Sequence, residues 1–215
     1  MSARPSPEDD AHFMTRALEL ARAQLGHTAP NPSVGCVLVM DNAIIGEGAT
    51  GAGGRPHAEE IALTAAGKLA RGATAYVTLE PCNQRSGGTA SCSQLLLAAG
   101  VSRVVIAVDD PHPLGAHGAN RLDDAGVSIE HGLMGSEAER LNAGFFKRIA
   151  TGRPWLAIDH DASSYDGAFN LAGDETPEAA LDRLGAAGFT RVCALPGTAL
   201  AEQLRARGLV DEDRS

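Results

Sequence analysis

The chain has 215 residues, of which 44% are hydrophobic and 21% charged, a balance that is typical of folded globular proteins and excludes disorder throughout. The formal net charge of −9 at pH 7 argues against a protein that neutralises nucleic-acid phosphates, so we expect a small polar substrate and no nucleic-acid partner. No apolar run is long enough to span a bilayer, and the first residues carry acids where a signal peptide carries bases. We therefore expect a cytoplasmic protein without membrane association.

The first predicted element is a helix, whose start is marked by Ser6 as N-cap, Pro7 at the first helical position and Asp9 as a capping-box acid. A nearly continuous apolar, β-branched run at 34–40 predicts a buried strand, and the turn signal after it predicts an antiparallel return at 43–48. Helices and strands then alternate: helix 57–69, strand 75–79, helix 93–99, strand 103–108, short helix 120–125, strand 127–131 and helix 136–150. This order predicts a three-layer α/β/α sandwich with a mixed five-stranded sheet.

The composition shifts after residue 152, so we expect a first domain at 1–152 and a tail at 153–215. The patterns in the tail predict strand 155–158, helix 177–187, strand 190–195 and helix 200–207. They describe a short α/β tail, and its length of about 60 residues is small for an independent hydrophobic core.

The strongest chemical signal is a histidine followed by two cysteines: His57, then Cys82 after a proline, then Cys92. One imidazole and two thiolates are the ligands of a catalytic zinc ion that keeps a fourth position open for water, whose pKa zinc lowers to about 7. Glu59 lies two residues after His57 and can carry protons without being a ligand. We predict a Zn²⁺ site of His57, Cys82 and Cys92, with Glu59 as the catalytic acid and base.

Each of these residues alone is more often structural, as a surface histidine or a buried small cysteine. Their order, with Cys82 at a strand end and Cys92 at a helix start, favours the metal site. The other two cysteines, Cys36 and Cys193, are interpreted as buried apolar residues. We expect no disulfides, because the chain shows no secretion signal.

An H-x-E element followed by P-C and a second cysteine resembles the signature of the cytidine-deaminase-like zinc deaminases. Here nine residues, 83–91, separate the cysteines, where that signature has two. Segment 29–37 further resembles the P-N-P-x-V-G-[AC]-V opening of the riboflavin-biosynthesis diaminohydroxyphosphoribosylaminopyrimidine deaminases, the deaminase half of bifunctional deaminase/reductases. Segments 76–82, 110–114 and 141–145 resemble other motifs of this family. The resemblance extends over about residues 12–155.

The resemblance implies hydrolytic deamination of 2,5-diamino-6-(5-phosphoribosylamino)pyrimidin-4(3H)-one, a phosphoribosyl pyrimidine, by a homo-oligomer. It also implies that Asn31 and Asp110 line the substrate pocket. The asparagine amide can donate to and accept from a pyrimidine edge or a ribose hydroxyl. From the residues alone, Asn31 can also be a turn residue between two prolines, and Asp110 can cap the loop that follows it.

The substrate-reading loops depart from the family pattern. The segment between the cysteines is one residue longer than S-H-H-G-[RK]-T-P-P and lacks its paired histidines and prolines. His112 stands where the family has the asparagine of D-P-N-P, and His117 lies in a segment that replaces V-A-G-[RK]-G. We take His112 as a substrate-binding candidate, and Arg85 and His117 as candidates for binding the phosphate. The alternative is that Arg85 and His117 are solvated loop residues.

The tail resembles parts of the NADPH-dependent reductase domain of the bifunctional family. Segments 154–158 and 162–167 resemble its first strand and its A-x-S-L-D-G motif, and 189–212 resembles a much later segment. The middle is missing, and Pro196 stands where glycines let the backbone approach phosphates. We therefore expect a degenerate reductase-like remnant without reductase activity, the alternative being a disordered tail.

Two other functions stay open at this point. One is a related deaminase that acts on a different pyrimidine or pterin-like amine, and the other is a non-catalytic paralogue that binds a pathway ligand. Glu59 argues against the paralogue, because a structural zinc ion has no need of this carboxylate. A tRNA deaminase is opposed by the acidic net charge and by the P-N-P opening.

Overall fold

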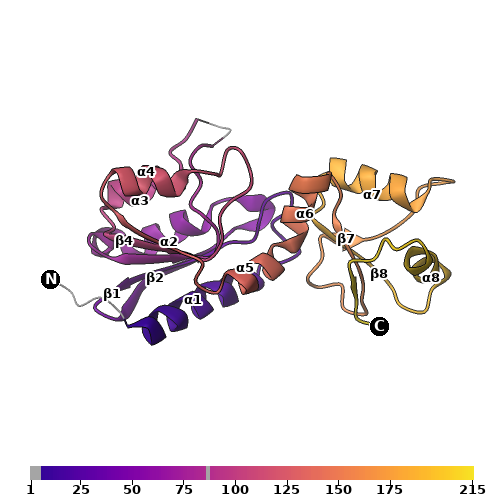
Figure 1. Cartoon of the computed structure of the whole chain (residues 1–215), viewed down its shortest axis with the longest axis horizontal. Coiled ribbons are helices and arrows are strands. Elements are labelled where there is room, and N and C mark those ends of the chain that lie inside the picture. The colour runs from indigo at the N-terminus through magenta and orange to yellow at the C-terminus, as the bar shows by residue number, and fades with distance from the viewer. Residues whose placement is uncertain (1–5, 86–87) are drawn as a thin grey trace. The chain divides into compact units, whose positions relative to one another are not determined.

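The computed structural model describes residues 6–85 and 88–215, which divide into two compact units (Figure 1). The first unit contains nearly all of the chain up to Leu141, and the second contains Asn142–Ser215 together with the loops Gln24–Pro32 and Ala52–Gly54. Within the described ranges, no helix combines the length and apolar character needed to cross a membrane.

A five-stranded sheet forms the centre of the first unit, in the strand order β2-β1-β3-β4-β5. Its strands are β1 (Gly35–Met40), β2 (Ala43–Ala49), β3 (Thr74–Val77), β4 (Arg103–Ile106) and β5 (Ser128–His131). β1 pairs antiparallel with β2 and with β3, whereas β3, β4 and β5 run parallel. Every residue of β3 and β4 is buried, as expected for strands that are covered on both faces. The predicted mixed five-stranded sheet is confirmed.

Helices cover both faces of this sheet (Figure 1). They are α1 (Pro7–Arg22) and α5 (Gly135–Leu141) on one face, and α2 (Ala58–Ala66), α3 (Cys92–Ala99) and α4 (Gly118–Asp124) on the other. The start of α1 has the predicted capping box: Asp9 N donates to Ser6 Oγ at 3.2 Å, and Ser6 N donates to Asp9 Oδ2 at 3.1 Å. The three-layer α/β/α sandwich is therefore also confirmed.

Some helix boundaries differ from those predicted. α2 ends at Ala66, and a 3₁₀-helix (Gly67–Ala70) follows, because Gly67 takes a non-helical conformation with φ 54° and ψ −129°. The single helix predicted at 136–150 is wrong: it is divided at Asn142 into α5 and α6 (Ala143–Thr151). A Cβ at Gly144 would lie 2.4 Å from the Thr190 carbonyl oxygen, so α6 takes its direction from a tertiary contact that apolar spacing does not show.

Two glycines let the helix that carries part of the predicted metal site pack directly on the sheet. A Cβ at Gly46 would lie 2.3 Å from the Ala62 carbonyl oxygen, and a Cβ at Gly48 would lie 2.2 Å from that of Ala58. Real side chains do not approach backbone this closely, so β2 needs glycine at both positions. The start of α2, immediately after His57, is thereby held against the sheet.

A buried charge network joins α1 to the sheet. Arg103 on β4 donates from Nη1 and Nη2 to the two carboxylate oxygens of Asp10 at 2.8 and 2.7 Å, and from Nε to Glu130 at 2.7 Å. The Tyr76 hydroxyl donates to Asp10 Oδ1 at 2.5 Å. Asp10 is 8% exposed and Arg103 5%, so the pair is well shielded from solvent.

We expect the Asp10→Ala substitution to lower the free energy of unfolding by about 3 kcal/mol, because breaking a buried ion pair leaves a desolvated charge without its main partner. Urea unfolding followed by circular dichroism measures this loss. The control is Glu19→Ala, which removes an exposed carboxylate that pairs with Arg16 on the same helix and should change stability little. Equal stability of the two variants would contradict a structural role for the network.

The second unit contains a four-stranded sheet of order β7-β8-β6-β9, in which all pairs are parallel. Its elements are β6 (Trp155–Ile158), β7 (Gly167–Ala168), β8 (Arg191–Ala194), β9 (Glu212–Asp213), α6, α7 (Pro177–Ala186) and α8 (Ala199–Ala206). A core cluster includes Leu156, Phe169, Leu181, Val192 and Leu204. The tail therefore has a core of its own, although its length argued against one. The domain boundary after residue 152 stays a prediction.

Candidate metal centre

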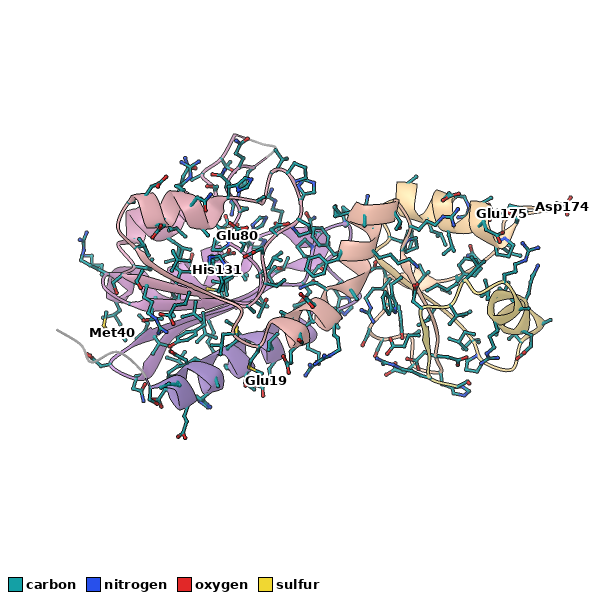
Figure 2. The ribbon with its side chains drawn as sticks, in the orientation of Figure 1. Glu19, Met40, Glu80, His131, Asp174 and Glu175 are labelled. Carbon is teal, nitrogen blue, oxygen red and sulfur yellow. The ribbon has the colours of Figure 1, made fainter. Side chains whose placement is uncertain are left out.

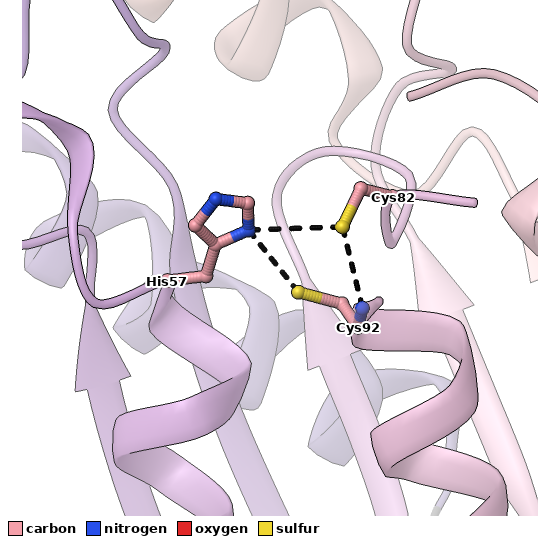
Figure 3. Close-up of side chains that lie close together, drawn as sticks. All are labelled: His57, Cys82 and Cys92. Carbon is pink, nitrogen blue, oxygen red and sulfur yellow. Dashed lines mark hydrogen bonds between the residues drawn. The ribbon is translucent and has the colours of Figure 1, made fainter. Parts of the chain in front are cut away.

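The three predicted ligands come from separate parts of the first unit (Figure 3). His57 is the N-cap residue of α2, Cys82 lies in the loop after β3, and Cys92 is the first residue of α3. In open α/β sheets, sites form outside the carboxyl ends of the parallel strands, and β3 ends on this side. The fold therefore brings together residues that are 35 positions apart in the chain.

The ligand atoms of these residues converge. His57 Nδ1 lies 3.2 Å from Cys92 Sγ and 3.7 Å from Cys82 Sγ, and Cys92 N donates to Cys82 Sγ at 3.3 Å. All three ligand atoms lie within 4.8 Å of one another. One imidazole nitrogen and two sulfurs at this separation fit a zinc ion, which favours nitrogen and sulfur ligands and needs only three from the protein in catalytic sites.

The electrostatics of the two thiols differ, because the hydrogen bond with Cys82 and burial raise the pKa of Cys92 well above its usual value. The hydrogen bond from Cys92, together with one from His57, lowers the pKa of Cys82 to about 3. A thiolate is therefore present at neutral pH, and the thiolate is the form of cysteine that binds metals. The other two cysteines are buried as predicted, with Cys36 fully buried in β1 and Cys193 4% exposed in β8.

Glu59, the predicted acid and base, lies in the first turn of α2 and is 3% exposed. Burial raises the pKa of its carboxyl group, and the nearby Cys82 contributes in the same direction. A carboxyl group whose pKa is raised toward neutrality can both accept and release a proton during one reaction cycle.

Two acidic residues of the site were not predicted. Glu80 lies in the interior of the first unit (Figure 2), where it accepts hydrogen bonds from Ala119 N at 2.9 Å and Asp110 N at 3.3 Å. Glu60 accepts a hydrogen bond from His57 N at 2.7 Å. The spacing of Glu60, three residues after the N-cap His57, is the capping-box signal that could have identified it.

Asp110 and His112 lie together in the loop after β4. His112 N donates to Asp110 Oδ1 at 2.8 Å, so the carboxylate caps the loop that follows it. Leu114 N donates to His112 Nδ1 at 3.2 Å. A Cβ at Gly115 would lie 1.8 Å from Asp110 Oδ2, so a larger residue there would displace this carboxylate. Burial raises the pKa of Asp110 to about 6.

This pKa predicts a pH-dependent cost in stability. The ionised form of Asp110 is disfavoured in the folded protein, so Asp110 lowers the free energy of unfolding above about pH 6, and the cost disappears toward the unfolded pKa of 3.8. We expect Asp110→Asn, which can still accept from His112 N, to stabilise the protein by about 1 kcal/mol near pH 7.5 and by less near pH 4.5. Urea unfolding at both pH values checks this, and an equal effect at both would contradict it.

The other substrate-binding candidates have different surroundings. Arg85 points inward, with Nη2 3.0 Å from Glu60 Oε2 and 3.2 Å from Cys92 Sγ. His117 is exposed at the start of α4, and within the described ranges no hydrogen bond joins its side chain to the metal ligands. Asn31 belongs to the second unit, where its Nδ2 donates to the Gly53 carbonyl oxygen at 3.2 Å. The roles of all three toward a substrate stay predictions.

The proteins that are similar to this chain include riboflavin biosynthesis proteins and a named deaminase. A family model described as the cytidine and deoxycytidylate deaminase zinc-binding region matches residues 7–108. Over 168 residues the chain is 50% identical to the riboflavin biosynthesis protein RibD of Escherichia coli, covering 78% of this chain and 45% of that protein. Over 147 residues it is 46% identical to the diaminohydroxyphosphoribosylamino-pyrimidine deaminase of Buchnera aphidicola, covering 68% of this chain and 99% of that protein.

Solved structures of other proteins have a similar fold. The RibD structure of Acinetobacter baumannii superposes with a TM-score of 0.81 at 27% identity, covering 96% of this chain and 85% of that chain. The Rib2 deaminase of Aspergillus oryzae, at 23% identity and a TM-score of 0.52, shares the fold. The chain thus spans less than half the length of its Escherichia coli relative and nearly all of the Buchnera deaminase.

Proposed function

The chain belongs to the diaminohydroxyphosphoribosylaminopyrimidine deaminase family of zinc-binding deaminases, and we propose that it hydrolyses an amino group from 2,5-diamino-6-(5-phosphoribosylamino)pyrimidin-4(3H)-one. The observation that carries this proposal is the convergence of the His57, Cys82 and Cys92 ligand atoms beside the buried carboxyl group of Glu59. The 46% identity to the Buchnera protein, whose name states this substrate, supports the substrate class.

In the proposed reaction, water replaces the amine on a ring carbon and ammonia leaves. The zinc ion, when held by His57, Cys82 and Cys92, supplies Lewis-acid activation of the water. Glu59 takes the proton that the attacking water loses and passes it to the ring nitrogen. The same carboxylate then passes the remaining proton of the added hydroxyl group to the amine, which leaves as ammonia when the carbonyl forms. Burial of Glu59 keeps bulk water from competing for these protons.

The substrate contacts are part of the proposal. Asp110 and His112 form the loop beside Glu80, which ties the Asp110 main chain to the start of α4. In the first unit, the cyclic substrate would be read by Asp110 and His112 and its phosphate by His117, whereas Arg85, the other phosphate candidate, lies against Cys92. The family resemblance supports Asn31 as a further substrate contact.

The experiment that tests the function is ammonia release from the phosphoribosylaminopyrimidine, measured beside cytidine, guanine and tRNA. We expect release from the first substrate alone. Release from one of the others would indicate a related deaminase of different specificity. A zinc-loaded protein that releases ammonia from none of them would favour the non-catalytic, ligand-binding paralogue.

We also propose that residues 153–215 are a reductase-like remnant without reductase activity. Two of the four strands, β7 and β9, contain two residues each, and a single helix connects β7 to β8. Pro196 follows β8 at the turn where the reductase motif has glycine. So small a sheet offers little surface to enclose a dinucleotide.

From this proposal we expect the full chain not to bind NADPH in the micromolar range. A fluorescence or calorimetric titration measures the affinity, and a bifunctional deaminase/reductase serves as the positive control. Micromolar binding, or NADPH-dependent reduction of the deaminated ribosyl product, would contradict the proposal.

Two finer points complete the proposal. The family resemblance supports a homo-oligomer, which light scattering at several protein concentrations can measure. A cytoplasmic location, without nucleic-acid or membrane partners, suits a site that depends on reduced thiols, because disulfides do not persist in that compartment.

A further inference from the structure

A buried arginine from the segment between the two cysteines lies against the metal centre. The Arg85 side chain is 4% exposed, and its Nη2 lies 3.2 Å from Cys92 Sγ and 3.0 Å from Glu60 Oε2. The same Glu60 oxygen accepts the hydrogen bond from His57 N at 2.7 Å. Arg85 and Glu60 therefore link the backbone of one predicted ligand to the sulfur of another.

We propose that Arg85 is a positioning residue of the metal centre, which holds the Cys92 sulfur in place for zinc while Glu60 holds the guanidinium in place. The inference rests on the proposed zinc deaminase function and adds a residue outside the ligand set. With this role, the altered segment between the two cysteines would act at the metal centre and not at the substrate phosphate.

The physical reason is the charge of the ligand. A guanidinium N–H that donates to sulfur holds that sulfur in one position, because charge-assisted hydrogen bonds are strong where water is excluded. When zinc is bound, the Cys92 sulfur would carry negative charge in a shielded site, and the nearby guanidinium would offset that charge. Groups that hydrogen-bond to metal ligands typically change metal affinity by about 10–100-fold.

The inward position of Arg85 carries a cost that these contacts must offset. Arg85 Nε is buried and has no hydrogen-bond partner in the part of the chain that the structure describes. An unpaired buried donor loses its hydration without compensation. The contacts of Nη2 with Cys92 and Glu60 are the interactions that favour this buried position.

The test measures how fast zinc passes from the protein to an excess of a chromophoric chelator. We expect Arg85→Gln to lose zinc about 10–100-fold faster than the wild type, and Arg85→Lys, which keeps a charged donor, to recover part of the loss. Glu60→Gln should also lose zinc faster. The matched control is Arg121→Gln, because Arg121 contacts the same segment through Asn83 Oδ1 at 2.7 Å and should retain zinc like the wild type.

Kinetics on the same samples separate this role from phosphate binding. A positioning residue lowers kcat more than it raises KM for the phosphorylated substrate. Wild-type zinc retention in Arg85→Gln overturns the proposal, and a raised KM alone would then assign Arg85 to the phosphate. If circular dichroism shows that Arg85→Gln does not fold, Arg85→Lys and Glu60→Gln decide in its place. A wild-type chain that binds no zinc would overturn the proposed function itself.

Discussion

The Glu59→Gln variant is expected to bind zinc like the wild type and to lose at least about 10⁴-fold in turnover, the upper end for a positioned acid and base. Glu59 is 3% exposed in the first turn of α2, two residues after His57. One carboxylate is proposed to move protons in several steps, so its loss affects more than one barrier. Glutamine has nearly the same shape but neither accepts nor releases a proton. Steady-state ammonia release, with zinc content measured on the same sample, tests this expectation.

The control for this variant is Glu47→Gln, which neutralises a carboxylate of the same unit that pairs with Arg16 on α1 at 2.7 Å. It should leave turnover unchanged. Activity of Glu59→Gln within tenfold of the wild type would mean that another group moves the proton. Loss of zinc from Glu59→Gln would show instead that the carboxylate supports the metal centre.

Much of the first unit, and the convergence of the three candidate ligands, could be predicted from the sequence. The run at 34–40 is apolar at nearly every position because β1 is covered on both faces, and such a run predicts a central strand. The convergence of His57, Cys82 and Cys92 could be predicted because metal chemistry restricts the residue types.

The features that the sequence did not predict depend on contacts between residues of separate elements. The inward position of Arg85 requires Glu60 and Cys92 to be in place, and no local pattern records that contact. The role of Glu80 depends on amides of α4 and of the loop after β4. The break at Asn142 falls within a continuous helical pattern, so the sequence does not indicate that α6 packs against β6.

The second large effect is expected from Cys82→Ala, which removes one of three proposed ligands. The wild type should carry about one zinc ion per chain, and the variant should retain little after dialysis against a chelator. Removing a residue that hydrogen-bonds to a ligand typically lowers metal affinity by about 10–100-fold. Removing a ligand itself should lower zinc affinity by more than this. The low pKa of Cys82, about 3, means that this residue supplies a thiolate at neutral pH that alanine cannot replace.

The matched control is Cys193→Ala, a cysteine-to-alanine change in the second unit. Burial raises the pKa of the Cys193 thiol, so it is not poised to bind a metal, and its removal should leave zinc content unchanged. Metal analysis of both variants decides the assignment, because any loss that comes only from removing a buried thiol would affect both. Full zinc retention in Cys82→Ala would remove Cys82 from the site. Since Cys82 Sγ also accepts from Cys92 N, the variant should in addition loosen the start of α3.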